Sequence, residues 1–107
     1  MTFVSTGDYP TVAMLPGIAR TVVASGDGAM VVRFELDNGA VLPGHSHPHE
    51  QMGVVISGTL DLTIGGETRS LQAGDSYVAP PNTIHSAVAI ERTVVLDVFA
   101  PPRADYL

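Results

Sequence analysis

The chain consists of short runs of β-forming residues separated by glycine and proline, and this punctuation restricts the folds open to it. Eleven glycines and eight prolines are spread through 107 residues. Helix interiors tolerate neither residue well, whereas turns between strands often require them. No window of adequate length has apolar residues at a 3.6-residue period, and residues 103–107 are too few for a stable helix. The pattern therefore predicts an all-β sandwich or barrel.

The expected strands are the runs between these breaks. Residues 59–64 (TLDLTI) alternate polar and apolar side chains, as a half-buried strand does. Gly65 and Gly66 then fit a two-residue hairpin turn, with residues 67–71 as the returning strand. A total of about nine or ten short strands suits a double-sheet jelly roll. The other expected strands cover residues 18–24, 29–36, 40–42, 51–57, 76–79, 84–89 and 93–99.

Two features of the composition limit the chemistry and the partners. The chain has no cysteine, so disulfides and thiolate ligands are excluded, and nitrogen and oxygen atoms must hold any bound metal. The formal net charge is -6, with five Lys and Arg residues. This balance argues against binding to nucleic acid or to an anionic membrane, because both require a basic surface. It does not exclude a small anionic substrate, because one arginine can bind a carboxylate through two hydrogen bonds.

The length and the ends of the chain give further expectations. A chain of 107 residues predicts a single domain over residues 1–107, with a core over residues 18–100. No apolar run reaches the roughly 18 residues that span a bilayer. Residues 1–10 lack the basic and apolar regions of a signal peptide. We therefore expect a cytoplasmic protein.

Three of the four histidines fall in one segment, HSHPHEQ, at residues 45–51. In an extended chain His45 and His47 point to the same face, and Gln51 shares their parity if the strand is regular. His85 lies far away in sequence, within PPNTIH. Imidazole nitrogens and an amide oxygen suit a divalent ion of Ni, Zn, Fe, Mn or Co, with positions left open for substrate or water. The alternative is a group of surface histidines in a proline-containing loop.

The residues around these histidines resemble the two motifs of the cupin superfamily. Residues 39–58 fit the first motif at every position except Gln51, which stands where glutamate is usual. The segment GDSYVAPPNTIH keeps the Pro80 and His85 of the second motif. The resemblance spans residues 30–99 and implies a double-stranded β-helix, the cupin jelly-roll barrel, with the two motifs on adjacent hairpins. It also implies that one metal ion is held by His45, His47, Gln51 and His85.

The end of the chain holds a second group of candidate residues. Asp97 interrupts the apolar run TVVLDVF and shares a face with Val95 and Phe99. One interpretation places Asp97 in solvent on the outer face of the sheet and Arg103 on the surface. The other places Asp97 at the mouth of the barrel as a general acid or base, with Phe99 as a stacking wall and Arg103 as a clamp for a carboxylate.

This tail, together with the histidine segment, resembles the small uronate-processing cupins of pectin and alginate breakdown, the KdgF-like proteins. The segments HSHPHEQ, TIGGE, GDSYVAPPNTIH and DVFAPPRADYL carry the resemblance. That family converts 4,5-unsaturated monouronates to linear ketonised sugars. The resemblance implies a metal-dependent isomerase with a uronate substrate, and active-site roles for Asp97, Phe99 and Arg103.

Other functions stay open at this level. The enzyme alternatives are a metal-dependent cupin dioxygenase and a polyketide cyclase, although three Phe, three Tyr and no Trp argue against a large aromatic ligand. The non-enzymatic alternative is a small-molecule-binding cupin. The remaining histidine, His49, is expected on the surface, with a lining position in the pocket as the alternative. We also expect a homodimer, because the β-rich segment from residue 11 to 24 has no other obvious role and bare edge strands invite pairing.

Overall fold

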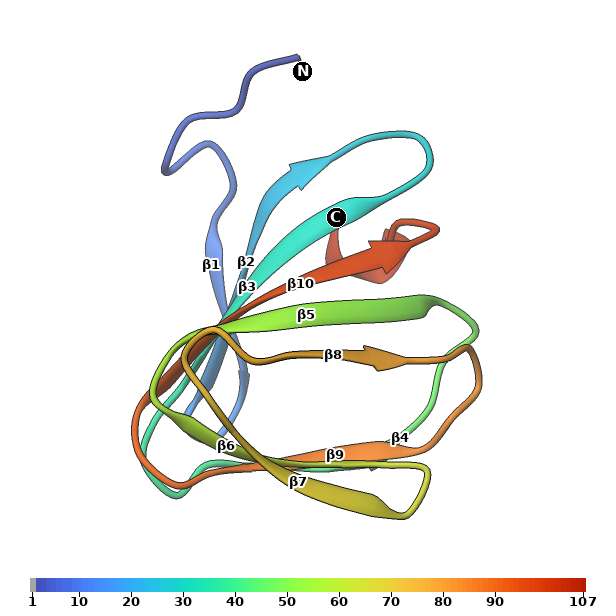
Figure 1. The fold of residues 1–107 in the computed structure, drawn as a ribbon. Helices are drawn as coiled ribbons and strands as arrows, with labels where there is room; N and C mark the ends of the chain where they lie inside the picture. The colour runs from blue at the N-terminus through green and yellow to red at the C-terminus, as the bar shows by residue number, and fades with distance from the viewer. Residues whose placement is uncertain (1) are drawn as a thin grey trace.

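The computed structural model describes residues 2–107 as two antiparallel β-sheets that lie one above the other in Figure 1. The six-stranded sheet has the order β1-β2-β3-β10-β5-β8, and the four-stranded sheet has the order β4-β9-β6-β7. The expectation of an all-β fold is confirmed. The strands are β1 (Thr11–Leu15), β2 (Ile18–Ser25), β3 (Met30–Leu36), β4 (Val41–His45), β5 (Glu50–Ser57), β6 (Thr59–Ile64), β7 (Glu67–Gln72), β8 (Ser76–Ala79), β9 (His85–Ala89) and β10 (Thr93–Ala100).

The core lies between the two sheets. Residues along β3 and β10 alternate between buried and partly buried, which is the pattern of a strand with one face in the core. Phe99 on β10 and Val32 on β3 are among the most completely buried side chains. The four-stranded sheet contributes Leu60 and Leu62 from β6, and Ala87 and Ala89 from β9. Both sheets therefore share one apolar interior.

The strand register places several polar residues at this interior. Asp97 on β10 lies opposite Gly53 on β5, and Gly53 in turn lies opposite Tyr77 on β8. In the other sheet, the last residue of β4, His45, pairs with the first residue of β9, His85. Residues far apart in sequence are thus aligned by backbone hydrogen bonding.

The C-terminal tail packs against the core, and the N-terminal strands β1 and β2 belong to the larger sheet. The tail forms one 3-10 turn, Ala104–Tyr106, and the ring of Tyr106 packs edge-on against Phe34 and Phe99. Within residues 2–107, we find no helix with the length and hydropathy that a membrane crossing demands. At the other end, β2 is an internal strand with Ile18 and Val22 buried, so part of the N-terminal segment has a role within the chain itself. β1 forms an edge of the larger sheet, and its residues are mostly exposed.

Candidate active site

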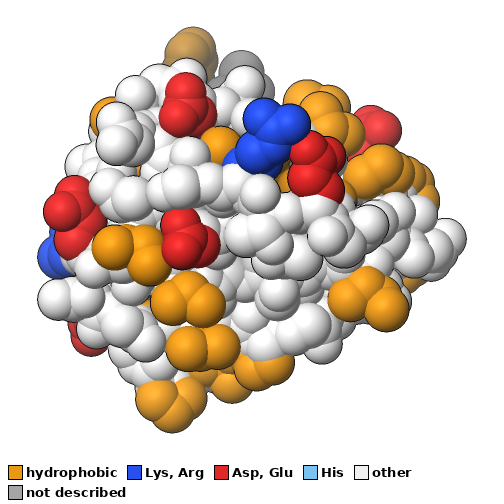
Figure 2. All heavy atoms as spheres, turned by 60° about the horizontal axis from the view of Figure 1, so that its bottom comes forward, with side chains coloured by type: hydrophobic (Ala, Val, Ile, Leu, Met, Phe, Trp, Pro, Cys, Tyr) orange, Lys and Arg blue, Asp and Glu red, His pale blue; other side chains and the backbone are white. Residues whose placement is uncertain are grey.

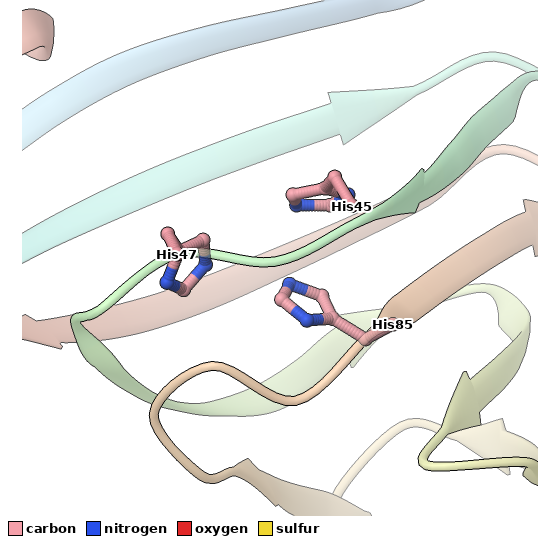
Figure 3. Close-up of side chains that lie close together, drawn as sticks. All are labelled: His45, His47 and His85. Atoms are coloured by element: carbon pink, nitrogen blue, oxygen red, sulfur yellow. The ribbon is translucent and has the colours of Figure 1, made fainter.

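Three histidine rings converge inside the molecule. His45 ends β4, His85 begins β9, and His47 follows in the segment that leads from β4 to β5. The ring centres of His45 and His47 lie 4.2 Å and 5.0 Å from that of His85, and one ring nitrogen of each residue lies within 4.8 Å of the others (Figure 3). His47 and His85 are buried, so the interpretation as surface histidines is wrong for both. Figure 2 looks at the side where the four-stranded sheet lies and shows hydrophobic and acidic side chains there, with no histidine in view.

The Nδ1 atom of each ring is fixed by a backbone carbonyl group two residues away. His45 Nδ1 lies 2.9 Å from the oxygen of Pro43, and His85 Nδ1 lies 2.9 Å from that of Thr83. His47 Nδ1 lies 3.0 Å from the oxygen of His49. A carbonyl oxygen can only accept, so each Nδ1 carries a proton, and in the neutral ring Nε2 then has a free lone pair. The three rings are therefore in the tautomer that binds a metal through Nε2.

Burial disfavours the charged form of His47 and of His85 and leaves one nitrogen without a partner. Loss of solvent lowers the pKa of His47 and of His85 below the ordinary histidine value. His85 Nε2 is buried and makes no hydrogen bond in the described residues. A buried nitrogen lone pair without a partner is costly, and a bound cation would satisfy it. The donor set, nitrogen and oxygen without thiolate, fits a divalent transition metal.

Gln51 connects this cluster to an acidic residue. Its Nε2 donates to Asp97 Oδ2 at 2.7 Å, which turns its Oε1 toward His47 Nε2 at 3.0 Å. Because His47 is protonated at Nδ1 and its pKa is lowered, Oε1 and Nε2 face each other as two acceptors. Two acceptors aimed at one space are the arrangement expected of two ligands for one cation. Regular strand parity does not cause this contact, since His47 lies outside β4 and β5.

Asp97 lies inside the protein, not on the outer face of the sheet. It is 2% exposed, which rules out the solvated interpretation. Burial raises the pKa of Asp97 to about 6, while hydrogen bonds from Tyr77 and Gln51 act in the opposite direction. A carboxyl group with this pKa exchanges protons readily near neutral pH.

Tyr77 was not among the candidate residues from the sequence. Its hydroxyl donates to Asp97 Oδ1, so Asp97 accepts one hydrogen bond on each oxygen. The available signal was Gly53, a glycine within the strand run QMGVVIS. Glycine inside a strand often marks the close approach of another group. Here the approaching groups are the side chains of Tyr77 and Asp97.

Arg103 and Phe99 line the cavity that also contains Asp97. The Arg103 guanidinium group lies 4.3 Å from the ring centre of Tyr106 and 5.4 Å from that of Phe99. It also donates to Asp105 through Nε at 3.1 Å and Nη2 at 2.8 Å, and this interaction lowers the pKa of Asp105. Phe99 is 1% exposed and belongs to the core as well as to the pocket wall. Tyr106 and Asp105 were missed because their roles depend on how the tail folds back.

Most of the candidate side chains described above line one cavity. This cavity is lined by residues of both sheets and of the tail. Its polar lining residues are His45, Gln51, Tyr77, His85, Asp97, Arg103 and Tyr106. The rest of the lining is apolar, which favours a small ligand held by a few polar contacts. Neither His47 nor His49 is among the lining residues, and His49 is partly buried rather than fully on the surface.

Replacing His85 with alanine is expected to weaken the binding of a divalent metal by at least about 10- to 100-fold, because one ligand of the set is removed. Isothermal titration of the metal-stripped protein with Zn²⁺ measures the loss. The matched control is His49→Ala, which removes a histidine that does not join the cluster of His45, His47 and His85. Equal metal affinity in His85→Ala and the wild type would contradict the site.

The comparisons with known proteins agree with the fold. Residues 32–99 match the Cupin domain family. The chain is 38% identical over 93 residues to the pectin degradation protein KdgF of Dickeya dadantii, covering 85% of this chain and 84% of that protein. The solved structure of KdgF from Halomonas sp. superposes with a TM-score of 0.91 at 39% identity, covering 98% of this chain and 97% of that one. A solved RmlC-like cupin from Shewanella frigidimarina superposes with a TM-score of 0.94 at 28% identity, covering 100% and 96%. The chain therefore belongs to the cupin family, and within it to the KdgF-like cupins.

Proposed function

We propose that this chain is a metal-dependent isomerase that opens the ring of 4,5-unsaturated monouronates and ketonises them to linear keto sugars. The observation that carries the proposal is the buried Asp97, which accepts a hydrogen bond from Gln51 beside the histidine cluster and lies in the same pocket as Arg103. The likeness to KdgF, named as a pectin degradation protein, supports the same class of substrate. Ring opening followed by tautomerisation needs no redox cofactor.

The residues that would hold the metal are His45, His47 and His85 through Nε2, and Gln51 through Oε1. A divalent ion there supplies positive charge that stabilises negative charge developing on a substrate oxygen. The neutral amide of Gln51 leaves more of that charge in place than a glutamate would. Which divalent metal occupies the site depends on the softness of the ligands and on the supply of metals.

Asp97 would carry the proton through the reaction. Its carboxylate accepts the proton of the C1 hydroxyl group while the bond between C1 and the ring oxygen breaks. The products of that step are an aldehyde at C1 and an enolate at C5. The protonated Asp97 then gives its proton to C4, and C5 becomes a ketone. Atoms and electrons balance, because one proton moves from oxygen to carbon and nothing is oxidised. A pKa of about 6 suits a group that must both accept and donate.

Arg103 and Phe99 would orient the sugar. Two of the five N–H groups of Arg103 are used by Asp105, and the others are available to the C6 carboxylate. Such a contact explains how a protein of formal charge -6 binds an anionic substrate. The edge of Phe99 would pack against the apolar face of the ring.

The test uses an unsaturated monouronate prepared with a polysaccharide lyase. Metal-loaded protein is expected to speed the loss of the ultraviolet absorbance of the conjugated alkene above the rate in buffer. Proton NMR of the product should show the linear keto sugar. A rate equal to that in buffer, with a chain shown to be folded and metal-loaded, would end this proposal.

A homodimer is proposed for the same chain. The support is β1, an exposed edge strand on which Val12 and Leu15 are each 37% exposed. Apolar edge strands pair readily with another strand. Light scattering after size exclusion is expected to give twice the 11.2 kDa of one chain. A mass of 11.2 kDa at micromolar concentration would refute the dimer without affecting the active site.

A further inference from the structure

Tyr77 makes a buried contact that the proposed reaction does not by itself require. It comes from β8, two strands away from β10, and its hydroxyl reaches Asp97 across Gly53 of the strand between them. Burial and the nearby Asp97 charge hold the pKa of Tyr77 well above its ordinary value, so its hydroxyl stays protonated. Tyr77 is therefore a constant hydrogen-bond donor.

Gly53 is the residue that makes this contact possible. A Cβ atom at this position would overlap Asp97 Oδ1 and would lie 2.6 Å from the hydroxyl oxygen of Tyr77. Contacts below 3.0 Å are essentially never made by real Cβ atoms. Any side chain at residue 53 would thus force Asp97 and Tyr77 apart. The glycine keeps a space in the sheet that the hydrogen bond occupies.

We infer that Tyr77 is a positioning residue, which holds the carboxyl group of Asp97 in one orientation for proton transfer. Gln51 fixes Oδ2 from the side of the histidines, and Tyr77 fixes Oδ1 from the side of β8. With both oxygens held, the carboxyl group cannot rotate about its bond to Cβ. A proton-transfer group must stay within hydrogen-bond reach of the reacting atoms, and a group free to turn would lose that geometry. This inference rests on the proposed function, because the transfer that it serves is the one from C1 to C4.

The test is Tyr77→Phe, assayed on the unsaturated monouronate with bound metal measured in parallel. We expect kcat to fall roughly 10- to 100-fold, the rate equivalent of one hydrogen bond to a charged group. KM is expected to change less than about twofold, and metal content not at all, because Tyr77 positions a proton-transfer group and not the substrate. In a background of Asp97→Asn, the same substitution should have almost no further effect. The matched control is Tyr9→Phe, a tyrosine outside this pocket, with kinetic constants like those of the wild type.

Two outcomes would overturn the inference. One is an unchanged kcat in Tyr77→Phe, and the other is a full additional loss in the Asp97→Asn background. Gly53→Ala gives a second variant: it should lower kcat if folded, and its failure to fold leaves the Tyr77→Phe result decisive.

A measurement that does not depend on catalytic activity tests the positioning role of Tyr77 separately from the proposed function. In the proton NMR spectrum, the hydroxyl proton of Tyr77 should appear downfield of the backbone amides and vanish in Tyr77→Phe. The absence of that signal in the wild type at low temperature would show that Tyr77 does not hold Asp97. Its presence in a chain that is inactive on uronates would sustain the positioning of Asp97 and refute only the substrate.

Discussion

Replacing Asp97 with asparagine is expected to lower kcat/KM for the unsaturated monouronate by roughly 10²- to 10⁴-fold, the usual contribution of a positioned acid or base. Asparagine has nearly the shape of aspartate but cannot accept and return a proton. The bound metal should be retained, because Asp97 is not in the proposed ligand set. Steady-state kinetics and metal analysis of the same preparation measure both properties. The matched control is Asp61→Asn, since Asp61 lies on β6 between the buried residues Leu60 and Leu62 and so faces away from the core.

The same variant has a stability signature. Burial raises the pKa of Asp97 from 3.8 to about 6, so the folded chain binds a proton more tightly than the unfolded chain. The contribution of Asp97 to stability is therefore fully present below pH 3.8 and is lost as pH rises through about 6. This shift corresponds to about 3 kcal/mol. Urea unfolding of the metal-stripped proteins should show Asp97→Asn gaining about that much relative to the wild type between about pH 3 and pH 8. A difference that does not depend on pH would mean that Asp97 is not a buried, titrating group.

Replacing Gln51 with glutamate is expected to lower kcat by about 100-fold or more while the metal stays bound. Gln51 donates to Asp97 through Nε2 and presents Oε1 to the histidine cluster at the same time. A glutamate keeps the oxygen ligand but loses the donor, so two carboxyl groups would lie at hydrogen-bond distance. Such a pair shares one proton, which raises the pKa of one member strongly and occupies the group that must exchange protons.

Kinetics and Zn²⁺ titration of Gln51→Glu test this expectation. Gln72→Glu, at the exposed end of β7, adds the same charge away from the pocket and should behave like the wild type. Full activity in Gln51→Glu would show that the hydrogen bond from Gln51 to Asp97 has no part in catalysis. Loss of metal in that variant would instead place the effect on the ligand set.

Much of the fold is predictable from local signals in the sequence. Glycine and proline mark the strand ends, and the alternation in residues 59–64 and 93–99 identifies the buried faces. That alternation also places Asp97 on the same face as Val95 and Phe99, and all three are buried in the structure. The sequence alone does not exclude a solvated Asp97, because parity does not say which face of a strand is buried.

The assembly of the site is not predictable from local signals. No spacing rule brings His85 to His45, since their pairing depends on the register of β4 and β9. The family resemblance supplied that expectation. Neither local signals nor the family resemblance predicts the contact of Tyr77 with Asp97. That contact requires the strand order β10-β5-β8 and a glycine in the middle strand. Likewise, the ion pair of Arg103 with Asp105 lies at the 3-10 turn of the tail, where the Tyr106 ring packs against Phe34 and Phe99.

The most direct test is a metal titration in which catalytic activity is recorded at each step. The chain is stripped with a chelator and shown to be metal-free, and a divalent metal is then added back in steps while the alkene absorbance of the monouronate is recorded. If His45, His47, Gln51 and His85 hold one ion beside Asp97, activity should be absent at the start and should rise linearly to a plateau at one ion per chain. Full activity in the verified metal-free chain would contradict the account.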